Sequence, residues 1–202
     1  QQAVYRKWEE LDRKVLDPHK EYYTAVSEAL EQIQPSAIEK IRVNGKVAGG
    51  HIVCWNKAFE TGTDYCVTYD FKPLSPIGLG IVFFSAKGTS GQDVLAESLT
   101  PRHGVFSQYT RGDIDCYHIS YWANNAAVGK RDTCNLRKNS GFYYLADGPD
   151  PSVIGLDYST KEFHFRTHRI TLIKEGGHIR FFVDGEVSID YRDQRYNDIL
   201  TP

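Results

Sequence analysis

From about residue 41 onward, apolar and polar residues alternate with a period of two, in short runs separated by Gly, Asp, Asn and Pro. A period of two places successive side chains on opposite faces of a strand, and the separating residues favour tight turns. The sequence contains no βαβ alternation, no dinucleotide-binding glycine motif and no internal repeat. Many short strands joined by turns predict a mostly β, antiparallel two-sheet jelly-roll sandwich. The predicted strands are 41–47, 51–55, 65–71, 79–85, 114–122, 133–137, 142–146, 161–174, 178–183 and 186–191.

The first forty residues have a different pattern, with apolar residues at helical spacing and charges between them. Asp17-Pro18 ends one predicted helix and begins a second, and Pro35 ends the second. We therefore predict an N-terminal helical segment over 1–40 and a jelly-roll domain over 41–202. The longest connection of that domain, 86–112, is long enough to form a wall of a binding site.

Composition and charge narrow the classes of partner. The chain is 41% hydrophobic and 25% charged, as in an ordinary globular protein, and it has no apolar run long enough to span a membrane. A net charge of −2 and the lack of a nucleic-acid motif argue against a nucleic-acid partner. The opening Gln1-Gln2 fits a mature N-terminus after signal removal, which favours a secreted or periplasmic protein. The oligomeric state is left open.

The four cysteines leave the redox state open. None has the spacing of a structural zinc site. Cys54 and Cys66 lie in consecutive predicted strands, as do Cys116 and Cys134, so either pair could be cross-strand neighbours. The simpler interpretation is four buried, inert thiols.

The predicted strand 114–122 has one polar face, made of Cys116, His118, Ser120 and Trp122. Its other face, made of Tyr117, Ile119 and Tyr121, suits the core. A polar face that carries an indole fits a sugar, because sugar rings stack on flat aromatic side chains and their hydroxyls need hydrogen-bonding partners.

The strand after it extends this face. If residues 133–138 pair with 114–122, Asn135 and Arg137 share the face with His118 and Trp122. Because Arg binds carboxylates bidentately, an acidic sugar is the predicted ligand. The alternative is a solvated strand face with Arg137 in a surface ion pair.

Two further groups of polar residues favour structural interpretations. In 162–168, Phe163 and Phe165 are expected to face the core, and an outward row of polar residues is expected to form an ordinary solvent face. That row is Glu162, His164, Arg166 and His168. A weaker calcium hypothesis rests on three acidic residues near Gly148, but turn formation explains them better, so no cofactor or metal site is predicted. The three are Asp147, Asp150 and Asp157.

Several motifs resemble a known family. They are Gly112-Asp-Ile-Asp-Cys-Tyr-His-Ile-Ser-Tyr121, Cys134-Asn-Leu-Arg-Lys138, Gly141-Phe142 and Gly148-Pro-Asp-Pro151. In this order they resemble the YesU-like proteins, a bacterial domain family of unassigned function, and the resemblance covers roughly residues 50 to 191. It implies a concanavalin-like jelly roll and a role in plant polysaccharide use, since such proteins occur beside pectin-degrading enzymes.

One class of function is an enzyme that acts on an acidic polysaccharide or oligosaccharide, by lyase-type β-elimination or by hydrolysis. The E-x-D-x-x-E pattern of concanavalin-like glucanases is absent. A lyase needs a group that neutralises the uronate carboxylate, a base, and a proton donor for the leaving oxygen. Arg137 with Asn135 is the predicted carboxylate clamp, His118 the predicted base, and Tyr109 the predicted phenol.

The competing class is a non-catalytic carbohydrate-binding module. In that case Trp122 is the stacking platform and Arg137 supplies the charge. Ser120 and Lys138 are predicted as further substrate-binding residues.

Overall fold

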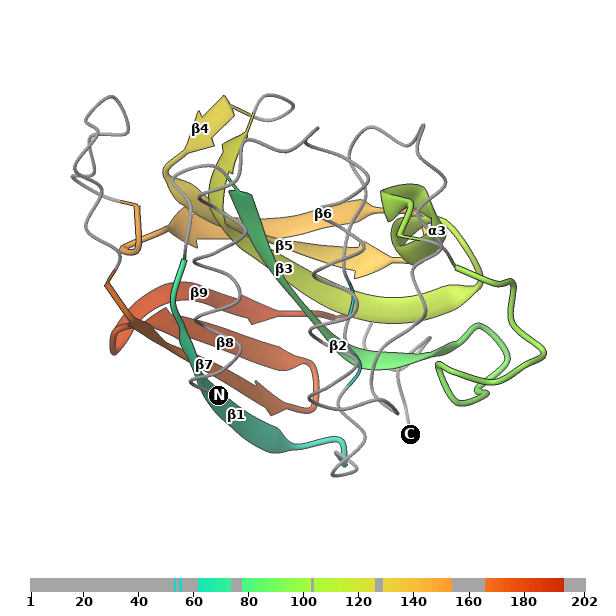
Figure 1. The fold of residues 1–202 in the computed structure, drawn as a ribbon. Helices are drawn as coiled ribbons and strands as arrows, with labels where there is room; N and C mark the ends of the chain where they lie inside the picture. The colour runs from blue at the N-terminus through green and yellow to red at the C-terminus, as the bar shows by residue number, and fades with distance from the viewer. Residues whose placement is uncertain are drawn as a thin grey trace, which may run out of the picture.

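A computed structural model of the chain describes residues 53, 55, 62–73, 78–102, 104–125, 129–153 and 166–194. The described residues form two antiparallel sheets, and Figure 1 shows them packed one against the other. One sheet has the strand order β1-β7-β8-β9, and the other has the order β2-β3-β5-β6 with β4 paired to β3. The predicted antiparallel sandwich is therefore confirmed. The elements are β1 (Tyr65–Phe71), β2 (Gly78–Gly88), α3 (Phe106–Thr110), β3 (Ile114–Asn125), β4 (Gly129–Arg131), β5 (Thr133–Asn139), β6 (Tyr143–Pro149), β7 (His168–Glu175), β8 (His178–Val183) and β9 (Glu186–Arg192).

The predicted strands match these elements closely where they overlap. β1 and β8 have the predicted bounds, and the other strands start or end a few residues away from prediction. The structure adds β4 and the short α3, neither of which was predicted. The predicted helices in 1–40, the strand 41–47 and the inward Phe163 and Phe165 lie outside the described residues. No helix in the described ranges is long and apolar enough to cross a membrane.

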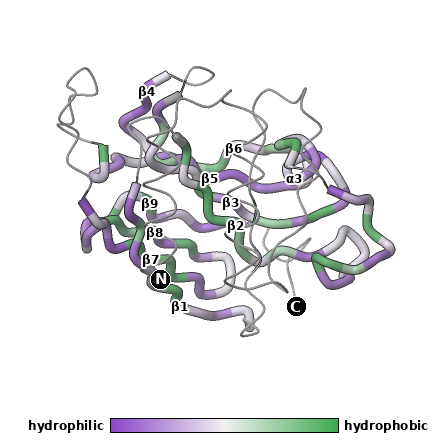
Figure 2. The backbone as a smooth tube through the Cα atoms, in the orientation of Figure 1, coloured by the Kyte–Doolittle hydropathy of each residue, from purple (hydrophilic) through white to green (hydrophobic). Residues whose placement is uncertain are grey.

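The main core lies between the two sheets. Tyr117, Ile119 and Tyr121 face inward from β3, as predicted, and they meet the buried side chains of the opposite sheet. The inward residues of β7 and β8 follow the same alternation, and Figure 2 shows hydrophobic and hydrophilic residues alternating along these strands. Burial of one face of each sheet is what a period-two pattern produces.

A second, smaller core lies on the outer face of the five-stranded sheet. Phe83 of β2 and Cys116 of β3 pack there with Tyr109 of α3 and with Val94 from the 86–112 connection. The connection therefore covers part of this face, and its role as a wall of a binding site stays a prediction. The rest of the face is built by β3, β5 and β6.

The cysteines are only in part as predicted. Cys116 lies opposite Asn139 and Cys134 lies opposite Gly148, so Cys116 and Cys134 are not cross-strand neighbours. Both are free and buried, whereas Cys66 is free and exposed, so the interpretation of four buried thiols was wrong for Cys66. Burial raises the pKa of the Cys116 thiol to about 12, which keeps it protonated and unreactive. Cys54 lies outside the described residues.

Candidate functional site

The register of β3 and β5 brings four of the predicted site residues to the outer face of the five-stranded sheet. His118 lies opposite Arg137, and Ser120 lies opposite Asn135. The pairing that the sequence analysis assumed for these two strands is therefore present. The outer face is this surface of the five-stranded sheet together with the residues of β2, β4 and β6 that point to the same side.

His118 is buried under aromatic rings. Its ring centroid lies 5.4 Å from that of Phe83, 6.0 Å from that of Phe106 and 5.7 Å from that of Phe142, and it is stacked on Phe142 at 17°. Only 1% of the residue is exposed. The rings come from β2, from α3 and from the turn after β5, so three separate segments close over the imidazole.

This environment keeps the imidazole neutral. Burial, and then the positive charge of Arg137, lower the pKa of His118 to about 3. The Nδ1 atom lies 2.9 Å from the side-chain amide nitrogen of Asn139, which donates to it and leaves the ring proton on Nε2. A buried ring held in this way does not reach a polymer on the surface, so the structure does not support His118 as a base that contacts substrate.

The predicted phenol is buried as well. Tyr109 is 1% exposed and lies in α3, with its ring 6.0 Å from that of Phe83 and 5.9 Å from the guanidinium of Arg102. Its role in the described structure is to anchor α3 over β2. The structure therefore does not place Tyr109 where it could protonate a leaving group.

The predicted position of Trp122 on the polar face was wrong. Its φ is +48°, and this left-handed conformation reverses the alternation of β3, so the indole lies between the sheets. There it packs against Phe71 and His168, with ring centroids 6.2 and 5.9 Å away, and 3% of the residue is exposed. The backbone amide of Trp122 donates to Asp150 Oδ2 over 2.7 Å. An indole so enclosed offers no face to a sugar.

The prediction that Lys138 contacts substrate was also wrong. Lys138 follows Arg137 on β5 and therefore points to the inner side of the sheet. Its ammonium lies 2.7 Å from the Oδ2 atom of Asp193, and both side chains are buried. The structure thus assigns Lys138 to an ion pair that links β5 to the residue after β9.

Arg137 stays at the surface of the outer face. Its guanidinium carbon lies 4.2 Å from the ring centroid of Phe142 and 5.3 Å from that of Tyr144. Among the residues that the structure describes, none accepts a hydrogen bond from this guanidinium or forms an ion pair with it. Tyr144, on β6 opposite Arg137, is 52% exposed. The result is a half-buried cation with aromatic neighbours and no anion among the described residues.

The sequence analysis did not assign Phe142 or Tyr144 to the site. Phe142 has a φ of +60°, which is unusual for a bulky residue, and this conformation turns its ring back over His118. Gly141-Phe142 was noted only as a motif of the family resemblance. The adjacent Tyr143 and Tyr144 in the predicted strand 142–146 were the available signal, but their exposure and the edge position of this strand are visible only in the structure.

The other end of the outer face is polar. The side-chain amide of Asn135 donates to Thr133 Oγ1 over 3.3 Å and to the Cys134 carbonyl over 3.1 Å. Ser120 Oγ accepts a hydrogen bond of 2.8 Å from Arg131, a residue that the sequence analysis also missed because β4 was not predicted. Asp147 of β6 lies opposite Asn135 and hydrogen bonds with Tyr144.

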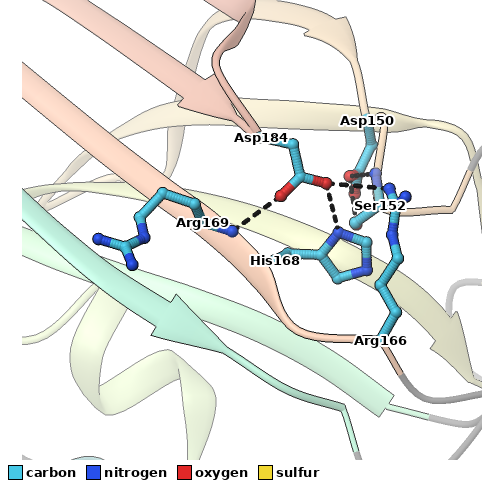
Figure 3. Close-up of polar contacts among 6 residues, drawn as sticks. All are labelled: Asp150, Ser152, Arg166, His168, Arg169 and Asp184. Atoms are coloured by element: carbon cyan, nitrogen blue, oxygen red, sulfur yellow. Dashed lines mark hydrogen bonds and ion pairs between the residues drawn. The ribbon is translucent and has the colours of Figure 1, made fainter.

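The polar residues around Asp184, shown in Figure 3, have a structural role. Asp184, in the turn between β8 and β9, accepts hydrogen bonds from His168 Nδ1 over 2.8 Å, from Arg166 over 2.9 Å and from the Arg169 amide over 2.8 Å. Burial opposes ionisation of Asp184, but the bond from His168 and the others outweigh it and lower the pKa of the carboxyl. The expected outward position of His168 was wrong, because the residue is buried against Trp122.

Of the acidic residues considered for calcium, Asp150 serves a turn, whereas Asp147 lies in strand β6. Asp150 is fully buried, and its Oδ1 accepts from the Ser152 amide over 3.1 Å, as Figure 3 shows. Its predicted role in turn formation is therefore confirmed. The described residues contain no group of three or more His, Cys, Asp or Glu that could hold a metal ion, and Asp157 lies outside them.

The neutral state of His118 predicts a pH-dependent stability. The imidazole becomes cationic when the chain unfolds at a pH between about 3 and 6.5, so unfolding takes up a proton in this window. Stability is therefore expected to fall as the pH falls, by up to about 1.4 kcal/mol per pH unit from this group. His118→Phe removes the titration and keeps an aromatic ring.

Urea unfolding of both proteins at about pH 6 and about pH 4 measures the effect. The variant is expected to gain about 2–3 kcal/mol relative to the wild type at the lower pH. An equal difference between the two proteins at both pH values would show that His118 is not held neutral.

Comparison with known proteins identifies the family. The model of a domain of unknown function, DUF1961, matches residues 21–201. The curated "Uncharacterized protein YesU" of Bacillus subtilis is 35% identical over 155 residues, which cover 75% of this chain and 67% of that protein. The resemblance stated from the motifs is therefore confirmed.

Two solved structures resemble this chain to different degrees. A protein of unknown function with a galectin-like fold, from Bacillus subtilis, has 35% identity and a TM-score of 0.57 over 68% of this chain and 59% of that one, so this chain spans less than two thirds of it. A carbohydrate-binding module, CBM66, from the same organism has 15% identity and a TM-score of 0.38 over 65% of this chain and 60% of that one, too remote to bear on function. The sandwich is thus a galectin-like jelly roll, and the chain belongs to the DUF1961 family of unknown function.

Proposed function

We propose that the outer face binds an acidic polysaccharide or oligosaccharide and acts as a carbohydrate-binding module. The observation that carries this proposal is the guanidinium of Arg137, which lies between the rings of Phe142 and Tyr144 without an anion among the described residues. A guanidinium whose plane is restrained by aromatic neighbours is ready to bind a carboxylate bidentately. It is also partly shielded from water, which strengthens its interaction with an anion.

The neighbours of Arg137 favour a sugar over a small inorganic anion. Tyr144 is 52% exposed, so β6 offers a large flat ring beside the charge. Sugar rings stack on such surfaces. Asp147 lies one row away, opposite the buried Asn135, and its exposed carboxylate offers an acceptor for hydroxyls.

Binding is favoured over cleavage because of burial. A general base has to come within hydrogen-bond reach of the proton that it removes. His118 and Tyr109 are each 1% exposed, so neither reaches a ligand held at Arg137. Of the predicted carboxylate clamp, Arg137 is left at the surface and Asn135 is buried, as are the two predicted proton-transfer groups.

Replacing Arg137 tests the proposal directly. Arg137→Gln removes the charge and keeps a polar side chain of similar length, and we expect the affinity for polygalacturonate to fall by about tenfold or more, because a charge-assisted hydrogen bond is lost. Affinity electrophoresis in gels containing polygalacturonate or a neutral galactan measures the loss and shows whether the charge of the polymer matters.

Arg169→Gln is the matched control. Arg169 is an exposed arginine on the other sheet, where it pairs with Asp70, so its replacement has the same charge change away from the outer face. Retention of the Arg137→Gln variant equal to that of the wild type would refute the proposal. Ultraviolet absorbance of an unsaturated sugar product would instead show that the protein is a lyase.

A further inference from the structure

A second arginine on the outer face, Arg131, forms its hydrogen bonds to neutral acceptors. The Nε atom of Arg131 donates to the Thr133 carbonyl over 2.8 Å, and Nη2 donates to the carbonyl and the hydroxyl of Ser120 over 3.0 and 2.8 Å. All three acceptors are neutral. Within the described ranges, Arg131 forms no ion pair with a carboxylate.

The three hydrogen bonds fix the orientation of this guanidinium. They use Nε and Nη2, and among the described residues none accepts a hydrogen bond from the two hydrogens of Nη1. Burial lowers the pKa of Arg131, which shows that the surroundings disfavour its positive charge. An anion at Nη1 would offset that cost without any rearrangement of the side chain.

The guanidinium of Arg131 reaches the row next to that of Arg137. Arg131 of β4 lies opposite Ala123, but its side chain is bonded to Ser120, which lies opposite Asn135, and Arg137 lies opposite His118 in the next row. Adjacent rows on one face are two residues apart, or about 7 Å along an antiparallel strand. The charge of Arg137 also lowers the pKa of Arg131, so the two cations repel each other.

Among the described residues, the nearby carboxylates form no ion pair with either arginine. Asp147 of β6 contributes one negative charge on the Asn135 row and hydrogen bonds with Tyr144. Lys130 and Asp132 form an exposed ion pair of their own, with 3.3 Å between Nζ and Oδ1. Asp150 is buried and bonded to Ser152 and the Trp122 amide, and its charge attracts Arg131 and raises the pKa of that guanidinium. Asp147 is therefore the one exposed carboxylate that the described part of β6 brings to this face.

We infer that Arg131 forms a second anion subsite beside Arg137, and that the ligand carries negative charges on neighbouring sugar units. The inference rests on the proposed function and narrows its ligand to a polyanionic chain, such as an oligouronate. A single acidic sugar occupies one subsite, whereas a short oligomer spans both and relieves the repulsion between the two cations.

Titration calorimetry with galacturonic acid, its dimer and its trimer tests the inference. For the wild type, we expect the affinity to rise by about tenfold from the monosaccharide to the first oligomer that spans both subsites, the factor of one further charge-assisted hydrogen bond. Binding of that oligomer is expected to weaken more steeply with added salt than binding of the monosaccharide, because more charges are screened.

Arg131→Gln is expected to lose the gain in affinity from the monosaccharide to the oligomer that spans both subsites. Arg131→Lys keeps the charge but not the planar fork, so it is expected to retain part of the gain. Lys130→Gln, next to Arg131 in β4, is the matched control for the charge change and is expected to keep the full gain. Thermal unfolding of each variant confirms that it is folded.

The outcomes separate the two proposals. No binding of any acidic sugar by the wild type would refute the proposed function. Binding of the monosaccharide and the trimer with equal affinity would overturn the second subsite alone and leave the proposed function standing. The wild-type affinities alone test the second subsite, even if Arg131→Gln fails to fold. If Arg131→Gln folds and its affinity still rises with oligomer length as in the wild type, the second subsite is also overturned.

Discussion

Replacing Asp193 with Ala is expected to destabilise the fold by about 3–5 kcal/mol, because it removes one partner of a buried ion pair. The carboxylate of Asp193 lies 2.7 Å from the Lys138 ammonium and accepts a hydrogen bond of 2.6 Å from the Tyr117 hydroxyl. The side chains of Lys138 and Asp193 are only 7% and 5% exposed. The variant leaves the ammonium in the interior without this carboxylate, and the free energy of unfolding in urea measures the cost.

Two controls distinguish this effect from a general loss of charge. Asp70→Ala breaks the exposed ion pair with Arg169 and is expected to cost at most about 1 kcal/mol. The double variant Lys138→Met with Asp193→Leu removes both charges and is expected to recover most of the stability lost in Asp193→Ala. A single Asp193→Ala variant as stable as Asp70→Ala would mean that Lys138 and Asp193 are not paired in the interior.

The second large effect is expected at Gly148, where the edges of the two sheets meet. A Cβ atom added to this residue of β6 would lie 1.5 Å from the backbone carbonyl oxygen of Ser188 in β9. Backbone cannot yield as a flexible side chain can, so β6 and β9 have to separate in a Gly148→Ala variant. We expect a loss of about 3 kcal/mol or more, at or beyond the upper end for an overpacked site.

Gly78→Ala is the matched control, since an added Cβ there meets no atom within 4 Å. The control is expected to change the free energy of unfolding by no more than about 1 kcal/mol. Because β6 also carries Tyr144, Gly148→Ala is expected to weaken ligand binding as well. A Gly148→Ala variant with wild-type stability would contradict the close approach of these two strands.

The strand pattern and the facing of the central residues were predictable because both are local. In β3, the alternation alone placed Tyr117, Ile119 and Tyr121 in the core, and the structure agrees. Once β3 and β5 were assumed to pair, the same alternation placed Arg137 on the face of His118. Each of these predictions needs only the two-residue repeat of an extended chain.

The chemistry of the site was less predictable. The alternation of β3 predicts Trp122 on the outer face, but its own positive φ turns the indole into the core. His118 has the right face, but Phe83, Phe106 and Phe142 cover it from three other segments. Whether a polar residue on the correct face meets water or a ring depends on contacts that the strand itself does not contain.

The sequence by itself determined the antiparallel sandwich, the inward face of β3 and the family of the chain, because alternation and motifs are properties of short stretches. Only the tertiary structure decided which polar residues stay accessible. Lys138 and Asp193 are 55 residues apart and meet through the packing of the two sheets. Arg137 is left without an anion because no described segment brings a carboxylate to it. Burial and charge pairing are set by such long-range contacts, and they changed the expected site from proton transfer at His118 to anion binding at Arg137.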